Sequence, residues 1–257
     1  MKLVSLLFIY FLFQCNSFAE ASSNVEIKLC YEDVSVYPWI TGDMKGLVIQ
    51  ELQHVEKIAN VKIKYIRLPW KRCQIDAQNG KLDGLIAASY TKERTNWGVY
   101  PTKKGGEIDR NLRLHTDSFI VYISKGSPIR FENGRFENLD NHPIGVQLGY
   151  SVGTNLEEQG YATHSSFSTA LDLIQALDAG VVKVAVLQNH ATIKTLNDFP
   201  KLKRNIKALK QPFKVADQYL LFTKTFYSKH PEISNRIWKS IPIARESADY
   251  KKNAIGI

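Results

Sequence analysis

One arginine, Arg94, follows a short apolar run at a place where α/β proteins commonly hold ligands. The sequence before it predicts a helix from Trp70 to Ala77 and a strand from Leu82 to Ala88. A polar turn with Ser89, Thr91 and Arg94 comes directly after that strand, at the sheet edge where α/β folds bind ligands. A guanidinium is planar and permanently charged, which suits bidentate pairing with a carboxylate.

Two common motifs for other chemistry are missing from the sequence. There is no H-E-x-x-H and no phosphate-binding loop. Glu32, in a loop with aromatic residues, is a candidate catalytic acid, but one carboxylate is weak support for an enzyme. We therefore expect no catalysis, no metal and no cofactor. The histidines are scattered singly, without metal-ligand spacing, at His54, His115, His142, His164, His190 and His230.

The charge balance is basic but carries no nucleic-acid signature. The chain has 34 Lys and Arg against 25 Asp and Glu, a net charge of +9. The basic cluster lacks interleaved aromatic residues, so we interpret it as a solvated face and expect no nucleic-acid partner. Its members are Lys201, Lys203, Arg204, Lys207, Lys210 and Lys214.

The first 21 residues have the features of a cleavable secretory signal. Lys2 is followed by an apolar run from Leu3 to Phe13 and by two small-x-small sites that end at Ala19 and Ala21. The run is too short to span a bilayer stably, although a membrane anchor is the alternative. Cys15 suggests a lipoprotein, but the residue before it, Gln14, fits that motif poorly. We expect an exported, soluble, periplasmic protein.

Two cysteines, Cys30 and Cys73, follow the predicted signal. In an exported chain they suggest a disulfide, the alternative being two buried free thiols. Cys30 ends the first predicted strand and Cys73 lies in the predicted helix at 70–77. A bridge over this separation stabilises by about 4 kcal/mol in the chain-entropy model.

Hydrophobic periodicity predicts two α/β units in succession. Alternation predicts a first strand at 25–31, and helical spacing of Val48, Leu52, Val55 and Ala59 predicts a helix at 46–60. A strand at 61–66 then completes a β-α-β unit with a parallel sheet. The residues at 202–213 are basic and read as irregular. Further strands are expected at 111–125 (split around 115–117), 143–147, 183–187 and 218–223, with helices at 149–159, 168–179, 188–197 and 231–248.

Two motifs resemble those of a known family. The pattern G-x-x-D-G-x-I at 80–86, followed by S-Y-T-x-E-R at 89–94, resembles the first-lobe signature of periplasmic solute-binding proteins of family 3. The VQLG sequence at 146–149, which turns into a helix through Gly153, is similar to the family's second-lobe signature. The resemblance implies an α/β type II periplasmic binding protein fold with parallel or mixed sheets and two crossing strands as a hinge. It places lobe 1 at 22–115 and 215–257 and lobe 2 at 116–214.

The resemblance also implies roles for individual residues. Arg94 would grip the carboxylate of an amino acid, with contacts from Ser89 and Thr91. Ser151 would close on the same anion from the second lobe. Tyr37 and Trp39 would form aromatic walls of the ligand cleft; the alternative is that they cap the core of the lobe.

One position departs from the family pattern. Gln188 stands where amino-acid receptors of the family usually have an Asp that neutralises the ligand's α-ammonium. The ligand would then lack an amino group, or its cation would be held by Glu32, Asp33 or an aromatic face such as Trp39 or Trp70. An amino acid is the first expectation, and a small carboxylate without an amino group is the alternative.

The family's activity gives the functional expectation. A monomeric binding protein would capture a small ligand by hinge closure and deliver it to an ABC transporter permease in the inner membrane. Two alternatives remain: a receptor for a separate signalling partner, and a periplasmic dehydratase-like enzyme on the same fold.

Overall fold

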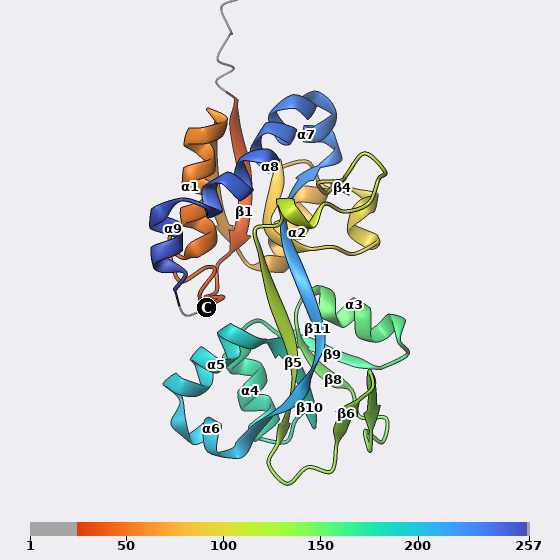
Figure 1. Ribbon diagram of the computed structural model, residues 1–257. Coiled ribbons are helices and arrows are strands. Elements are labelled where there is room, and N and C mark those ends of the chain that lie inside the picture. Colours follow the sequence, from red (N-terminus) through yellow and green to blue (C-terminus); the bar gives the residue numbers. More distant parts are fainter. Residues whose placement is uncertain (1–24, 256–257) are drawn as a thin grey trace, which may run out of the picture.

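The computed structural model describes residues 25–255, which form two α/β lobes joined by two long strands (Figure 1). These strands, β5 (His115–Ser124) and β11 (Ile206–Thr223), pair antiparallel and run from one lobe into the other. The predicted fold, two α/β lobes with two crossing strands, is confirmed. The predicted signal peptide lies outside the described residues. Between residues 25 and 255 no helix is long and apolar enough to cross a membrane.

Lobe 1 is the upper lobe in Figure 1 and is built around β1 (Glu26–Glu32). This strand pairs in parallel with its neighbours on both sides, an arrangement that requires crossover helices between the strands. Ile27 and Leu29 are fully buried and alternate with exposed residues, as the sequence pattern predicts. The other elements of the lobe are α1 (Leu47–Ala59), β2 (Lys62–Leu68), α2 (Trp70–Gln78), β3 (Gly84–Ser89), the 3-10 helices η1 (Glu93–Asn96) and η2 (Arg110–Leu112), β4 (Gly98–Val99), α7 (Lys224–Lys229), α8 (Pro231–Arg245) and α9 (Ala248–Asn253).

Lobe 2 is the lower lobe in Figure 1 and has β8 (Ile144–Gln147) at the centre of its parallel strands. Its other elements are β6 (Arg130–Glu132), β7 (Arg135–Glu137), α3 (Ser151–Glu158), β9 (Thr163–Phe167), α4 (Ala170–Asp178), β10 (Val184–Gln188), α5 (Asn189–Asp198) and α6 (Pro200–Asn205). The sequence analysis did not predict the strands β6, β7 and β9, which are short or weakly alternating.

The two hinge strands join the sheets of the lobes into one hydrogen-bonded order, β2-β1-β3-β11-β5-β10-β8-β9. The prediction of irregular structure at 202–213 is wrong, because these residues form the end of α6 and the first half of β11. Pro212 cannot donate to the ladder, and the register of β11 against β5 shifts on both sides of it. The first crossing strand begins at His115; Leu112, predicted as strand, lies in η2.

Each lobe has its own hydrophobic core. In lobe 1, Val48, Leu52 and Val55 of α1 are fully buried and belong to the same core cluster as Ile237 and Ile241 of α8. A second cluster in lobe 2 groups Phe119 and Val121 of β5 with residues of β8, α3 and β10. Few apolar side chains connect the cores: Ala191 of α5 belongs to the lobe 1 cluster, and Tyr150 packs against clusters of both lobes. Because these contacts are few, the lobes can move relative to each other while most of each core stays intact.

A disulfide joins Cys30 and Cys73, as the sequence analysis predicted. It connects the end of β1 with the middle of α2 inside lobe 1. Both cysteines are fully buried. The bridge therefore fixes the two elements next to Glu32 and Trp70, which both reach the space between the lobes.

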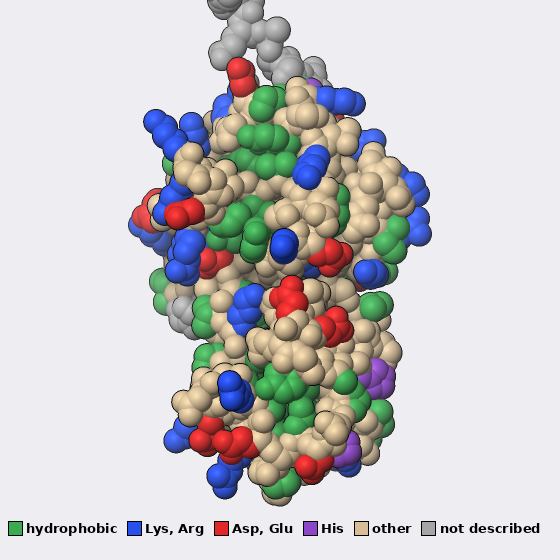
Figure 2. Space-filling view, turned by 90° about the vertical axis from the view of Figure 1, so that its right-hand side faces the viewer, with side chains coloured by type: hydrophobic (Ala, Val, Ile, Leu, Met, Phe, Trp, Pro, Cys, Tyr) green, Lys and Arg blue, Asp and Glu red, His purple; other side chains and the backbone are tan. Residues whose placement is uncertain are grey.

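The surface shows no continuous basic stripe on the face seen in Figure 2. Lys and Arg side chains are scattered over both lobes of this view, between acidic and hydrophobic ones. In the basic cluster at 201–214, Lys214 is half-buried and the other five basic residues are exposed, which agrees with the interpretation of this cluster as a solvated face.

Candidate ligand-binding cleft

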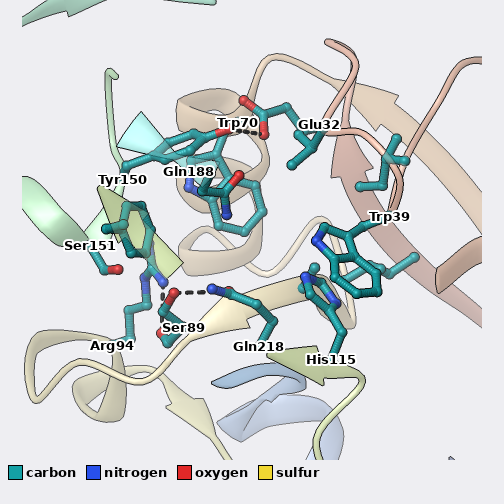
Figure 3. Close-up of a pocket in the computed structure, with 15 residues that line it drawn as sticks. Glu32, Trp39, Trp70, Ser89, Arg94, His115, Tyr150, Ser151, Gln188 and Gln218 are labelled. Atoms are coloured by element: carbon teal, nitrogen blue, oxygen red, sulfur yellow. Dashed lines mark hydrogen bonds between the residues drawn. The ribbon is translucent and has the colours of Figure 1, made fainter. Parts of the chain in front are cut away.

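A small cavity lies between the lobes at the hinge (Figure 3). Its volume is about 40 Å³, room for a few water molecules. Residues from both lobes and from both hinge strands surround it, and most of them are aromatic or polar. They are Glu32, Val36, Trp39, Ile40, Trp70, Ile86, Ala87, Ser89, Arg94, His115, Phe119, Tyr150, Ser151, Gln188 and Gln218.

Arg94 is buried at the edge of this cavity, in η1 directly after β3. Its Nη1 donates to the carbonyl oxygen of Ser89 at 2.8 Å, and its guanidinium lies 5.4 Å from the ring centroid of Trp70. The Thr91 hydroxyl accepts from the backbone N–H of Arg94 and so holds the turn. Among residues 25–255 Arg94 forms no ion pair. The site therefore contains a buried positive charge without an acidic partner.

The carbonyl oxygen of Gly149 in lobe 2 accepts three hydrogen bonds from lobe 1. The donors are Trp70 Nε1 at 3.1 Å, Gln74 Nε2 at 2.9 Å and Arg94 Nη2 at 3.2 Å. Gly149 has a φ of 76°, in the left-handed region that favours glycine. Three hydrogen-bond donors of lobe 1 therefore point to one position that suits an acceptor. In this closed arrangement the acceptor is the Gly149 carbonyl oxygen of lobe 2.

A second contact between the lobes joins Tyr150 and Glu32. The Tyr150 hydroxyl donates to Glu32 Oε2 at 2.7 Å. Burial raises the pKa of the Glu32 carboxyl to about 8; the hydrogen bond from Tyr150 acts in the opposite direction, and the nearby Asp33 adds to the rise. Burial also raises the pKa of Tyr150 well above its ordinary value. Glu32 is thus a buried carboxyl that holds its proton near neutral pH.

Ser89, Gln218 and His115 form a polar row on the floor of the cavity. Gln218 of β11 pairs with Ser89 of β3 on one side and with His115 of β5 on the other. The Ser89 hydroxyl donates to Gln218 Oε1 at 2.8 Å. His115 stacks on Trp39 with ring centroids 4.0 Å apart, and burial lowers its pKa to about 3, so its imidazole is neutral.

Asp117 lies beside the cavity and joins Trp39 to His190. Trp39 Nε1 donates to Asp117 Oδ2 at 3.1 Å, and His190 Nδ1 lies 3.0 Å from Asp117 Oδ1. The hydrogen bond to Asp117 raises the pKa of His190 above its ordinary value. Trp39 of lobe 1 and His190 of lobe 2 therefore share one hinge carboxylate.

The structure brings together most of the residues that the sequence analysis singled out. Two lie elsewhere: Thr91 holds the backbone of Arg94, and Tyr37 is 40% exposed and does not line the cavity. No group of three or more metal-ligating side chains occurs among residues 25–255. The residues that line the cavity as anticipated are Glu32, Trp39, Ser89, Arg94, Ser151 and Gln188.

Sequence reasoning missed eight cavity residues: four polar or aromatic ones, His115, Phe119, Tyr150 and Gln218, and four aliphatic ones, Val36, Ile40, Ile86 and Ala87. Gln218 and His115 were missed because their placement depends on the register between β11 and β5, and half of β11 was interpreted as irregular. Tyr150 lies within the predicted second-lobe turn, and only its position next to Gly149 hinted at a role.

The fold is similar to solved structures of binding proteins and of a sensor domain. A histidine kinase sensor domain with similarity to periplasmic binding proteins has a TM-score of 0.71 at 14% identity, covering 89% of this chain and 93% of that chain. The arginine-, lysine-, histidine-binding protein ArtJ from Geobacillus stearothermophilus has a TM-score of 0.68 at 17% identity, covering 89% and 93%. The GluR0 ligand-binding core from Nostoc punctiforme, in complex with L-glutamate, has a TM-score of 0.65 at 12% identity, covering 88% and 96%.

No protein-family model and no curated protein matches the chain. The structural similarities extend over nearly the whole described chain, and at these identities they establish the architecture. The resemblance seen in the two sequence motifs is thereby confirmed at the level of the fold. The chain has the type II periplasmic binding protein fold that amino-acid-binding proteins share with a sensor domain.

Proposed function

We propose that this protein is a periplasmic solute-binding protein that captures a small carboxylate, an amino acid or a related acid, between its lobes. The supporting observation is Arg94, a buried guanidinium at the cavity that has no acidic partner among the described residues. Burying an unpaired charge is costly, and a ligand carboxylate offers the partner with the best geometry. Delivery to an ABC transporter permease is the proposed purpose of this capture.

Capture requires the lobes to separate. The cavity of about 40 Å³ holds a few water molecules and is too small for an amino acid. The Gly149 carbonyl already accepts a hydrogen bond from Arg94 Nη2, and the Tyr150 hydroxyl already donates one to Glu32. A ligand would enter the open form, take the place of the Gly149 carbonyl at Arg94, and be enclosed when β5 and β11 bend back.

Ligand binding can be tested by a thermal-shift screen against amino acids and small carboxylates. A compound that binds the folded protein raises the melting temperature by mass action. We expect hits that contain a carboxylate and that are recovered unchanged after incubation. Stabilisation only by compounds without an acidic group would contradict the proposal. Conversion of the ligand to a product would favour the dehydratase-like alternative, with Glu32 as its acid.

A sensory role is the second candidate, supported by the similarity to a histidine kinase sensor domain. The two roles differ in the cell. Deletion of the gene should abolish uptake of the ligand if the partner is a permease. Unchanged uptake with a lost transcriptional or behavioural response would instead show that the partner is a separate signalling protein.

A further inference from the structure

The polar row on the cavity floor runs away from Arg94. Arg94 donates to the backbone of Ser89, and Ser89, Gln218 and His115 follow one another across the adjacent strands β3, β11 and β5. Directly opposed residues of antiparallel strands place their side chains on the same face. Adjacent strands are about 4.8 Å apart, so the row extends about 10 Å from Ser89 to His115. A ligand held at Arg94 would lie along it.

Three side-chain atoms at the cavity lack a hydrogen-bond partner among residues 25–255. They are Nε2 of Gln218 in the middle of the row, Nδ1 of His115 at its far end, and Oε1 of Gln188 on the neighbouring strand β10. Each of these side chains belongs to a residue that is more than nine-tenths buried and lines the cavity. Figure 3 shows the end of the Gln218 side chain directed toward Ser89, and Gln188 on the opposite side of the view from Gln218 and His115. Leaving such groups unpaired in a closed cleft costs free energy, so a bound ligand should supply their partners.

Apart from Arg94, the lining of the cavity carries no free charge. The two glutamines are neutral, and burial lowers the pKa of His115 to about 3. Asp117 is engaged by Trp39 and His190, while Asp217, which pairs with Arg110 and Arg113, does not line the cavity. Glu32 accepts the Tyr150 hydroxyl and its pKa is raised to about 8. A second charged end on the ligand would therefore be buried without a counter-charge.

On the basis of the proposed carboxylate-binding function, we infer that the ligand carries an uncharged group of the carboxamide type at its end distant from Arg94. Gln188 Oε1 would accept from the amide N–H, and Gln218 Nε2 would donate to the amide carbonyl. The neutral His115 would bond a remaining donor or acceptor. A primary carboxamide fits because it presents both a donor and an acceptor without charge.

Isothermal titration with six compounds of matched length tests this inference on the wild-type protein. Three are simple acids, namely glutaramate, glutarate and 5-aminopentanoate; three are the amino acids L-glutamine, L-glutamate and L-ornithine. Within each series the far end is a carboxamide, a carboxylate or an ammonium. We expect the carboxamide compound to bind about tenfold or more tightly than the other two members of its series.

Gln218→Glu keeps the size of the side chain and places a negative charge in the cavity lining, between Ser89 and His115. We expect glutaramate or L-glutamine to lose about tenfold or more in affinity and the ammonium compound of the same series to gain. Gln159→Glu makes the same change on the exposed end of α3 and should leave the ranking as in the wild type. The wild-type ranking needs no variant, so a poorly folded Gln218→Glu protein does not remove the test.

The outcomes separate the two proposals. Binding that depends on Arg94 but favours a charged far end, or shows no preference, overturns the carboxamide inference and leaves the proposed function intact. Binding of none of the six compounds overturns the carboxamide inference and leaves the proposed function to the thermal-shift screen. Binding that is unaffected by Arg94→Ala overturns both.

Discussion

The two lobes contribute different chemistry to the cleft. Lobe 1 supplies the ionisable and indole side chains, namely Glu32, Trp39, Trp70 and Arg94. Lobe 2 supplies uncharged groups, above all the Gly149 carbonyl and the Tyr150 hydroxyl, which bond to lobe 1. This division suggests that lobe 1 selects the ligand and lobe 2 closes over it. Changes in lobe 1 should then affect affinity or stability strongly, and changes in lobe 2 should mainly affect closure.

The largest effect on stability should come from the disulfide, which is present in lobe 1 and has no counterpart in the described part of lobe 2. Replacing Cys30 and Cys73 with alanine should lower the free energy of unfolding by about 4 kcal/mol. Denaturant titration measures this loss. Hydrogen exchange should show faster exchange in lobe 1 and little change in lobe 2; equal acceleration in both lobes would contradict the independence of their cores.

Glu32 should make stability depend on pH. Burial raises its pKa to about 8 in the folded protein, whereas that of a free Glu is about 4.3. Between about pH 4 and pH 8 the folded state binds more protons at Glu32 than the unfolded chain does, so stability decreases as the pH rises through this window. Glu32→Gln removes this contribution.

The melting temperature of Glu32→Gln should therefore fall less than that of the wild type between pH 5 and pH 8, each kcal/mol corresponding to about 2–4 °C. The variant's advantage should be greatest near pH 8. Glu107→Gln, in an exposed loop, serves as the control. Parallel pH profiles of wild type and Glu32→Gln would contradict a proton on Glu32.

Closure should depend on Gly149. A Cβ added there would lie 2.9 Å from Gln74 Nε2 and displace it from the Gly149 carbonyl. We expect Gly149→Ala to lower the ratio of closed to open form by roughly fivefold, the equivalent of about 1 kcal/mol. Gly160→Ala is a matched control, because Gly160 also has positive φ but no atom within 4 Å of the added Cβ. Small-angle scattering of the ligand-free proteins measures the shift; equal radii of gyration for both variants would contradict it.

The smallest effect should come from Ser151, a buried lobe 2 residue at the cavity. Removing its hydroxyl in Ser151→Ala should weaken binding by about 1 kcal/mol or less, because a single uncharged hydrogen bond contributes little. Ser168→Ala, on the exposed side of the same lobe, should leave affinity unchanged. A loss of affinity in Ser151→Ala as large as that caused by changing Arg94 would contradict the different roles of the two lobes.

The sequence predicted the fold where local patterns carry the information. Val48, Leu52 and Val55 repeat at helical spacing and form the buried face of α1. The two cysteines that follow the signal could be paired because their elements were adjacent in the predicted lobe. Arg94 could be found because a strand ends directly before it. These features depend on residues that are close in the chain.

Features that depend on pairing between distant segments were not predictable. Pro212 and the surrounding basic residues obscure the alternation in β11, so Gln218 could not be placed beside His115 and Ser89. Tyr37 was expected at the cleft because the family resemblance implies aromatic walls from its loop, but its side chain is 40% exposed and does not line the cavity. The Gly149 carbonyl is a backbone group, and no residue type marks its role.

The most direct test of the account is calorimetric titration of Arg94→Ala with a ligand found in the thermal-shift screen. The fold should survive, because the Ser89 carbonyl keeps its hydrogen bond from the Tyr100 hydroxyl. We predict a loss of about 2–5 kcal/mol in binding free energy and no loss in Lys92→Ala, which removes an exposed cation two residues away. Unchanged affinity in a folded Arg94→Ala protein would contradict the assignment of this cleft as a carboxylate-binding site.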